Sequence, residues 1–358
     1  MPVTMRDVAL RAKVSVATVS KCFGGKPSIP PRTRDAVLGI AAALGYRPHP
    51  YVSALMKIRR SRRTASRQRP ALAFVTAFET HDGWKKTPSP LVRLLHAGAE
   101  ERAEARGYQL SHHWLYRDGM TNQRFSEMLR HRGIRGLFLT PLPRLGMQID
   151  LTWPYFSVVA HGLSIAQPVF HRTSNDHYQS MILALNECWR RGYRRPGFAM
   201  DDPLSRRLEL RWEAAFVLHR EKLGFARGVP RLLYQTWDPD EVSRWIKRHR
   251  PDVVIALLTE EHLRQLADRG IRVPADVGVV SLSVHEPGGR LSGILQNAAL
   301  MGAVAADKLI DLVERNETGV PKDPVTLTIE GRWNDGGTVR ALVAVADAGV
   351  APRPGGGR

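Results

Sequence analysis

Cysteine, acidic residues and long apolar runs are all scarce in this chain of 358 residues. Its two cysteines, Cys22 and Cys188, are too few for a disulfide framework and lack the spacing of metal ligands, which fits a reducing cytosol. No run of about 18 apolar residues exists to span a membrane, and the first residues lack the apolar segment of a secretory signal. These absences predict a cytoplasmic protein without a membrane partner.

The short motifs that accompany common catalytic and nucleotide-binding sites are missing as well. The sequence contains no GxGxxG after a predicted strand, and no GxxxxGK[S/T], GxSxG or HExxH pattern. The adjacent histidines His112 and His113 lack the four-residue separation that would bring two imidazoles to one helix face. We therefore expect neither an enzyme nor a bound metal or other cofactor.

Positive charge is present in excess, and it is concentrated near the N-terminus. The formal net charge is +19. Residues 1–69 hold 15 Lys and Arg against only Asp7 and Asp35, so they carry +13 and the rest of the chain +6. A small, strongly basic segment joined to a milder body is typical of a polyanion-binding protein. The alternative at this stage is a basic proteome that raises the number of surface arginines.

Residues 1–46 are predicted to form three short helices. Thr4 followed by Asp7 has the pattern of a helix N-terminal cap, and Ser15 is expected to cap the second helix after a tight turn at residues 13–14. Two helices joined by such a turn form a helix-turn-helix, whose second helix lies in the DNA major groove. The alternative is a three-helix subdomain with an ordinary cap and core.

The second helix would present small and polar side chains to DNA. Small side chains let a helix sit deep in the groove, hydroxyls can donate to phosphates or bases, and a lysine can reach guanine or phosphate. The residues predicted to contact DNA from this helix are Ser15, Val16, Ala17, Thr18, Ser20 and Lys21.

The chain changes in character after residue 47. Pro48 and Pro50 break any continuous helix, and Lys57–Arg69 holds seven basic residues and no acidic one, which predicts a basic linker. From residue 70, short apolar runs alternate with amphipathic segments, as in doubly wound parallel sheets, and their number indicates two sheets. The predicted strands are 71–77, 136–140, 156–160, 196–200, 253–258 and 277–282, and the predicted helices include 91–106, 178–191, 211–223 and 300–315.

Two motifs together, VSVATVS at residues 14–20 and GYRP at residues 45–48, closely resemble the lactose repressor family of bacterial regulators. The resemblance implies a homodimer that binds double-stranded operator DNA, with a hinge helix that forms on DNA and with Leu55 as a wedge in the minor groove. It departs at Lys13, where the family usually has glycine. On this interpretation the DNA contacts also include Thr4, Thr33, Tyr46, His49 and Leu55.

The same resemblance implies a C-terminal part similar to periplasmic sugar-binding proteins, in which a small-molecule effector lies between two α/β subdomains. Residues 191–195, residues 271–277 and Gln296 match family patterns, and the chain is expected to cross between subdomains near 165–172, 292–298 and 322–330. The predicted organisation is a helix-turn-helix domain at 1–47, a hinge and linker at 48–69, one subdomain of 70–168 with 296–325, another of 169–295 with 326–340, and a disordered tail at 341–358.

The effector pocket departs from the family. Leu208 stands where the family has an arginine that grips sugar hydroxyls, and Ser281-Leu282-Ser283 replaces an acidic site, while Trp212 matches a structural tryptophan. By analogy with the family, the resemblance favours a repressor. It allows an effector of carbohydrate type. The alternative is a non-sensing or architectural DNA-binding dimer with a degenerate pocket. The candidate effector-binding residues are Glu79, His81, Asp176, Arg207, Trp237 and Asn297.

Overall fold

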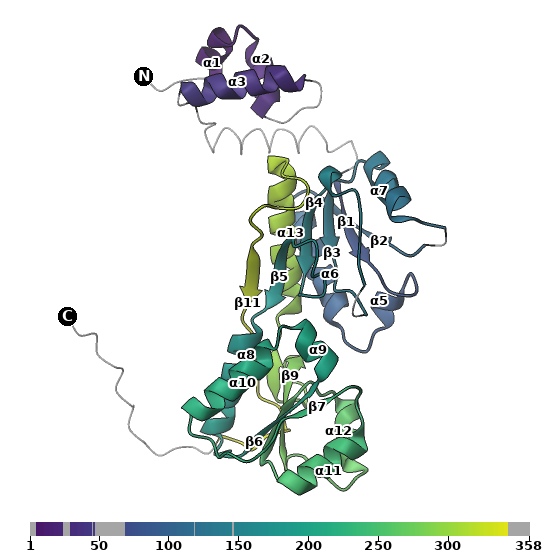
Figure 1. The fold of residues 1–358 in the computed structure, drawn as a ribbon, viewed down its shortest axis with the longest axis vertical. Coiled ribbons are helices and arrows are strands. Elements are labelled where there is room, and N and C mark those ends of the chain that lie inside the picture. Colours follow the sequence, from purple (N-terminus) through teal and green to yellow (C-terminus); the bar gives the residue numbers. More distant parts are fainter. Residues whose placement is uncertain are drawn as a thin grey trace, which may run out of the picture.

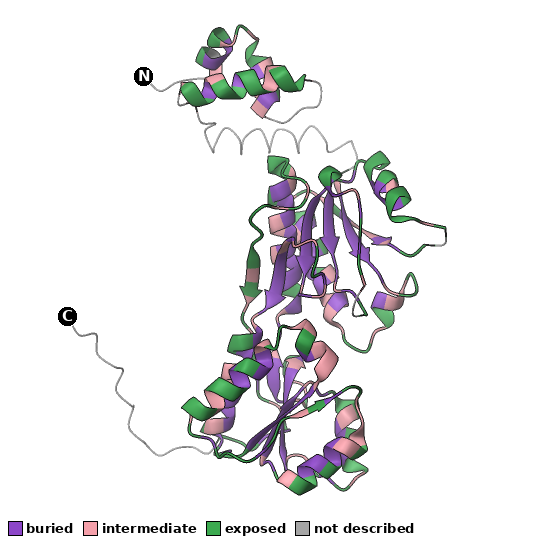
Figure 2. Ribbon diagram, in the orientation of Figure 1, coloured by how far each residue is buried: buried purple, intermediate pink, exposed green. Residues whose placement is uncertain are grey.

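The computed structural model describes residues 5–23, 29–44, 46, 69–117, 119–144 and 147–342, which form a small helical unit and two α/β halves (Figure 1). Of the predicted hinge and linker at 48–69, residues 48–68 lie outside the described residues, and so do residues 343–358 of the tail predicted at 341–358. Buried residues follow the strands of both sheets, and exposed residues lie on the outer faces of the helices (Figure 2). Each half therefore has its own core.

The N-terminal unit consists of α1 (Met5–Arg11), α2 (Val16–Phe23) and α3 (Pro31–Ala43). The apolar positions of each helix recur at helical spacing and meet in one core, as the sequence predicts. Cys22 is a free, buried thiol of this core and cannot reach Cys188, which is buried in the second α/β half. The buried residues of the core are Val8, Ala9, Val19, Cys22, Val37 and Ala41.

The turn between α1 and α2 holds Lys13 in the left-handed conformation, with φ at +52°. This conformation costs a residue with a side chain roughly 1–2 kcal/mol, which explains why glycine suits this position. The turn is closed by the Val14 N–H, which donates to the Ala9 carbonyl at 3.0 Å. Ser15 then caps α2, because its hydroxyl accepts from the Thr18 N–H at 3.0 Å, which confirms the predicted cap.

The first α/β half is built on six parallel strands in the order β11-β5-β4-β3-β1-β2. Helices α6 (Leu91–Ala105) and α13 (Ala298–Arg315) pack on one face of this sheet and α7 (Asn122–His131) on the other. The strands are β1 (Ala71–Thr76), β2 (Gln109–Trp114), β3 (Gly136–Leu139), β4 (Ser157–His161), β5 (His171–Asn175) and β11 (Thr326–Ile329), and short helices lie at α5 (Gly83–Lys86) and η1 (Trp153–Tyr155).

The second half has strands in the order β12-β10-β9-β8-β6-β7, parallel except for the antiparallel pair of β10 and β12. Helices α8 and α10 share one core with the sheet, and α11 and α12 share the other. The elements are β6 (Pro196–Asp201), β7 (Leu232–Tyr234), β8 (Val253–Ala256), β9 (Gly278–Val284), β10 (Gly293–Leu295), β12 (Arg332–Asn334), α8 (His177–Arg190), α9 (Asp202–Arg207), α10 (Arg211–Lys222), α11 (Pro239–His249) and α12 (Glu260–Ala267).

The two-sheet architecture agrees with the sequence-based prediction, but two of the predicted subdomain boundaries do not. Strand β5 was assigned by its sequence to the second subdomain, as was β11, yet both strands pair within the first sheet. The chain therefore crosses between the halves after Asn175, after Leu295 and after Ile329. The boundaries predicted at 168 and 325 fall several residues too early, because these two strands contain polar residues that do not resemble buried strands.

Helices α6 and α13 cross in very close contact, and two glycines make the crossing possible. A Cβ atom on Gly98 would lie 1.9 Å from the Ala299 carbonyl oxygen, and one on Gly302 would lie 2.0 Å from the Leu95 carbonyl oxygen. In both cases the obstacle is backbone, which cannot rotate away as a side chain can. The crossing therefore depends on the absence of side chains at these two positions.

We expect Gly98→Ala and Gly302→Ala to lower the free energy of unfolding by about 1–3 kcal/mol each, because the two helices must separate to admit a methyl group. The measurement is urea denaturation followed by circular dichroism. Gly39→Ala in α3 is the matched control, since nothing lies within 4 Å of its Cβ position. That substitution should stabilise its helix by up to about 1 kcal/mol. Equal stability of all three variants would contradict the close crossing.

Candidate functional site

Helix α2 presents one face to the core and the other to solvent. Val19 and Cys22 are buried, whereas Val16, Ala17 and Lys21 are exposed. An exposed valine and alanine beside a lysine form an apolar and cationic surface of the kind that contacts thymine methyl groups and phosphates. The face of α2 that the sequence predicts to contact DNA is therefore the face turned away from the core of the helical unit.

The remaining residues predicted to contact DNA differ in their exposure and in their contacts within the helical unit. Thr18 is half-buried and its hydroxyl lies 2.9 Å from the Ser15 hydroxyl, so both side chains are partly occupied by the cap. Ser20 and Thr33 are half-buried. Tyr46 packs edge-to-face on Phe23 with ring centroids 5.6 Å apart and closes the helical core. The three other predicted contacts lie outside the described residues: Thr4, His49 and Leu55.

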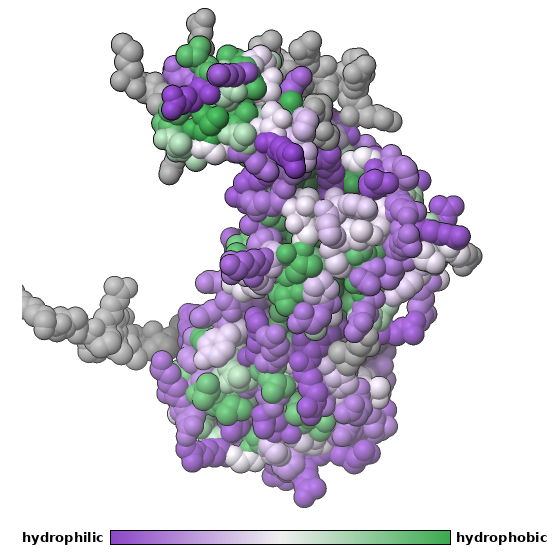
Figure 3. All heavy atoms as spheres, turned by 45° about the horizontal axis from the view of Figure 1, so that its top comes forward, coloured by the Kyte–Doolittle hydropathy of each residue, from purple (hydrophilic) through white to green (hydrophobic). Residues whose placement is uncertain are grey.

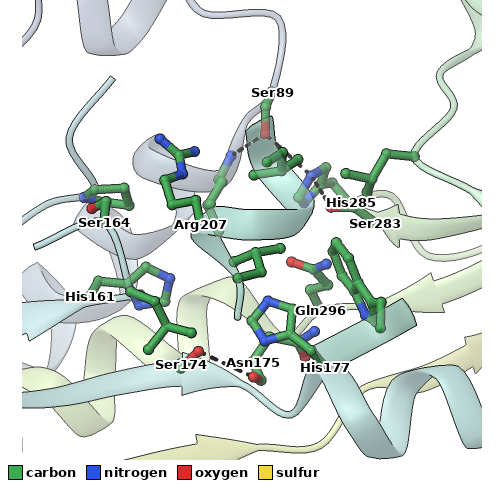
Figure 4. Close-up of a pocket in the computed structure, with 18 of the residues that line it drawn as sticks. Ser89, His161, Ser164, Ser174, Asn175, His177, Arg207, Ser283, His285 and Gln296 are labelled. Atoms are coloured by element: carbon green, nitrogen blue, oxygen red, sulfur yellow. Dashed lines mark hydrogen bonds between the residues drawn. The ribbon is translucent and has the colours of Figure 1, made fainter. Parts of the chain in front are cut away.

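A cavity of about 460 Å³ lies between the two α/β halves (Figure 4). It is reached by the carboxyl ends of parallel strands from both sheets, where the side chains that follow each strand converge. His161 ends β4, Asn175 ends β5 and Gln296 follows β10, and Figure 4 shows these side chains around one space. The volume is within the range of roughly 300–1,000 Å³ typical of small-molecule sites.

Three histidines line the cavity, and all are held in the neutral form. Burial lowers the pKa of His161 to about 3 and that of His177 to about 4, and each imidazole would repel the other or a nearby arginine when protonated. Burial also lowers the pKa of His285. The ring of His177 packs edge-on against Trp212 with centroids 4.7 Å apart. Because they are neutral, these imidazoles add polarity to the wall without adding charge.

Two polar contacts join the halves beside the cavity. Arg207 of α9 donates through Nη1 to the Leu142 carbonyl of the first half at 3.0 Å. Ser89 of the first half and the His285 imidazole of the second lie 3.4 Å apart through Oγ and Nε2. Burial lowers the pKa of Arg207, opposed by the charge of Asp201. Any change in the separation of the halves must alter both contacts.

Of the six predicted effector-binding residues, Arg207 lines the cavity and the other five do not. Glu79 is exposed and pairs with Arg144 at 2.6 Å. His81 packs with His112 and Trp114 in the first half. The carboxylate of Asp176 caps α8 by accepting from the Gln179 N–H.

The other two misplaced predictions are also explained by local contacts. Trp237 donates to the Gln265 side chain at 2.6 Å and stacks near His262, with centroids 4.3 Å apart, so its ring belongs to the second-half core. Asn297 adopts a left-handed φ of +36° at the start of α13 and donates to the Glu330 carbonyl at 2.8 Å. Both side chains are engaged within the protein.

Several residues that line the cavity were not among the predicted effector-binding residues. Trp212, interpreted there as structural, lines the cavity, and its indole N–H has no partner within the described residues. His161 and His177 were not proposed, and neither was His285. The missed signal is positional, because side chains at the carboxyl ends of adjacent parallel strands converge at one edge of a sheet.

The segments that match family patterns have structural roles here. Arg191 is buried, pairs with Glu187 and Asp335, and lies over the Trp333 ring at 4.8 Å. Tyr193 is fully buried, and its hydroxyl accepts from a backbone N–H of Arg340 at 2.8 Å. These two residues join α8 to the C-terminal end of the second sheet and do not line the cavity. Gln296, which also matches a family pattern, does line it.

Comparison with known proteins agrees with this two-part organisation. The profile for bacterial regulatory proteins of the lacI family matches residues 4–49, and the profile for the periplasmic binding protein-like domain matches residues 185–339. The N-terminal module therefore matches the lacI family, and most of the second α/β half matches the periplasmic binding protein-like domain. Helices α1 and α2 lie within the lacI match as its helix-turn-helix, and residues 185–339 hold most of the second half together with α13 and β11.

Similarity to curated relatives of the lacI family is confined to the N-terminal module. The HTH-type transcriptional regulator GalS of Salmonella typhimurium is 49% identical over 53 residues, which cover 15% of this chain and 16% of GalS. The match thus spans about a sixth of that relative's length. Beyond the module, the sequence has diverged much further.

Solved structures extend the likeness in fold to nearly the whole chain. A complex of the transcriptional regulator CelR with cellobiose has a TM-score of 0.55 at 21% identity and covers 94% of this chain and 99% of its own. The lac repressor dimer bound to operator and the anti-inducer ONPF has a TM-score of 0.55 at 18% identity, with 95% and 100% covered. Within the described ranges no helix has the length and apolar character to cross a membrane, and no three His, Cys, Asp or Glu side chains are grouped to hold a metal ion.

Acidification is expected to destabilise the protein through the cavity histidines. The pKa of His161, about 3, and that of His177, about 4, lie below the ordinary 6.5. Above pH 6.5, each neutral imidazole makes its full contribution to the free energy of unfolding. This contribution falls by about 1.4 kcal/mol per pH unit as the pH drops from 6.5 towards 4. His161→Gln should make the free energy of unfolding fall less steeply over this range, measured by urea denaturation. An unchanged slope would show that His161 is not held neutral by burial.

Proposed function

We propose that this protein is a homodimeric transcription regulator that binds operator DNA through the helix-turn-helix and senses a small molecule in the cavity between its α/β halves. The observation that carries the DNA-binding role is the exposed face of α2, where Val16, Ala17 and Lys21 stand free of the core. The net charge of +13 within residues 1–69 supports it, since phosphate contacts supply much of the affinity for DNA. Repression is the direction of regulation that the family resemblance favours.

A dimer is proposed because one helix-turn-helix reads only a half-site. Two protomers related by a two-fold axis match a near-palindromic operator. The proposed role of Leu55 is to wedge between base pairs at the centre of that site, where the bend gives both protomers more contact. The relatives with which the chain shares its N-terminal module are regulators by name, and this supports the same role here.

The cavity supports the sensing role over that of an architectural DNA-binding protein. A ligand bound between the halves changes their relative position only if its affinity differs between two arrangements. Arg207 and His285 contact the opposite half at the edge of the cavity, so a ligand there would act directly on the interface. The role that we propose for this cavity is regulatory, without catalysis.

Selection of binding sites from a random DNA pool tests the proposed function, with the full-length protein at about 150 mM salt. We expect a palindrome of roughly 14–20 bp with a flexible central step, which one helix per half-site and a central wedge require. Recovery of no consensus, with binding that is only salt-sensitive, would contradict sequence-specific regulation. In that case the architectural role would be favoured.

Lys21→Ala should weaken binding to the selected operator about tenfold or more and lower the slope of log affinity against log salt by about two per dimer, if each Lys21 neutralises one phosphate. The measurement is fluorescence anisotropy of labelled operator between 50 and 200 mM salt. Lys222→Ala, an exposed lysine of α10, is the matched control and should leave both quantities unchanged. An equal effect of the two substitutions would exclude a specific contact by Lys21.

A further inference from the structure

The wall of the cavity is mainly apolar. Leu163 and three prolines line it from the first half, and Leu204, Leu208 and Trp212 from the second. No aspartate or glutamate is among its lining residues in the part of the chain that the structure describes. The outer face of the two halves is different, since hydrophilic side chains cover most of the surface seen in Figure 3. The lining of the cavity therefore favours a ligand with a substantial apolar body.

Most polar side chains of the wall are already hydrogen-bonded within the protein. Gln296 Nε2 donates to the Leu282 carbonyl at 2.8 Å, and the Ser281 hydroxyl donates to the Leu258 carbonyl at 2.8 Å. The Ser164 hydroxyl accepts from a backbone N–H at 2.9 Å. A sugar would bring many hydroxyls into this space, and each one buried without a partner costs about 1–3 kcal/mol. The wall therefore disfavours a polyhydroxylated ligand.

Arg207 supplies the positive charge of the wall. Its neighbour Arg206 is exposed and pairs with Asp202 at 2.8 Å, whereas Arg207 is half-buried and directed between the halves (Figure 4). Among the described residues, Arg207 makes no ion pair within 4 Å, and its hydrogen-bond acceptor is the Leu142 carbonyl. A guanidinium has five N–H donors, so most of them remain for another acceptor. A half-buried cation of this kind is stabilised by an anionic partner.

We propose that the cavity binds a small monocarboxylate with an apolar body, whose carboxylate pairs with the Arg207 guanidinium. The planar guanidinium can form two parallel hydrogen bonds to a carboxylate, which is a strong and geometrically specific pairing. The apolar body lies against Leu163, Leu204 and Trp212, where its burial provides the remaining affinity. This assignment rests on the proposed function, because it names the class of molecule that the sensing cavity recognises.

Calorimetric titration of the full-length protein at pH 7.5 tests the ligand class. The probes are 3-phenylpropionate, 4-phenylbutyrate and octanoate, with 3-phenylpropionamide as the uncharged counterpart and cellobiose as the polyhydroxylated one. We expect at least one carboxylate to bind, and 3-phenylpropionate to bind about tenfold or more tightly than its amide, because the amide cannot form the charge-assisted pair. Cellobiose should give no binding at the same concentrations.

Substitution of Arg207 tests the residue assignment. Arg207→Gln should remove the preference for carboxylate over amide, and Arg206→Gln, the matched control on the adjacent exposed position, should retain it. Thermal unfolding without ligand establishes that each variant is folded. If Arg207→Gln does not fold, Arg207→Lys replaces it, since lysine keeps the charge and loses the planar fork, and it should bind 3-phenylpropionate several-fold more weakly than the unchanged protein.

Three results would overturn the carboxylate assignment: binding of cellobiose in preference to the carboxylates, equal affinity for 3-phenylpropionate and its amide, or no binding of any carboxylate up to 10 mM. Operator affinity is measured on the same preparations, so that the two proposals fail separately. Retained operator binding with cellobiose in the cavity would leave the regulatory function standing and remove the ligand class. Carboxylate binding without any change in operator affinity would support the ligand class and contradict the proposed sensing role.

Discussion

The structure depends on three connections that carry the chain between the two sheets and are hydrogen-bonded to one another. The first and third are joined where the Asp176 N–H donates to the Ile329 carbonyl at 2.9 Å. The second and third are joined by Asn297, whose side chain donates to the Glu330 carbonyl at 2.8 Å. Because these connections run beside the cavity, the contacts that hold the halves together also fix the positions of Asn175, His177 and Gln296 in its wall.

The structure also distinguishes two kinds of residue that the family resemblance does not: residues that stabilise the fold and residues that line the cavity. Arg191 and Tyr193 match family patterns and are buried far inside the second half, where they stabilise the fold. The cavity wall, by contrast, is mainly apolar, and it includes Leu208, Ser281 and Ser283, where the sequence resemblance leads one to expect charged residues. A shared fold and a different cavity wall are compatible, because the side chains at the carboxyl ends of the strands border the cavity.

Much of the fold could be predicted from the sequence, since the buried strands β1, β3, β4, β6, β8 and β9 are apolar runs and their helices are amphipathic. Strand β5 was missed because Arg172, Thr173 and Asn175 are buried but polar. Their hydrogen bonds to Gly162, His161 and Ser180 satisfy them in the folded chain, and no local pattern reveals such partners. The effector-binding residues were predicted poorly for a related reason. Which side chain faces the cavity depends on the geometry of the segment that follows each strand, as the adjacent Arg206 and Arg207 at the end of α9 illustrate.

The glycine-mediated crossing of α6 and α13 has a mechanical consequence for signalling. Helix α13 begins directly after the second connection, two residues from Gln296, so any movement of that connection is applied to the end of α13. With backbone against backbone at Gly98 and Gly302, the two helices have no deformable side chains between them to absorb the movement. The first half should then rotate as one rigid body. A change in the cavity would reach distant parts of the chain as a change in the angle between the two halves.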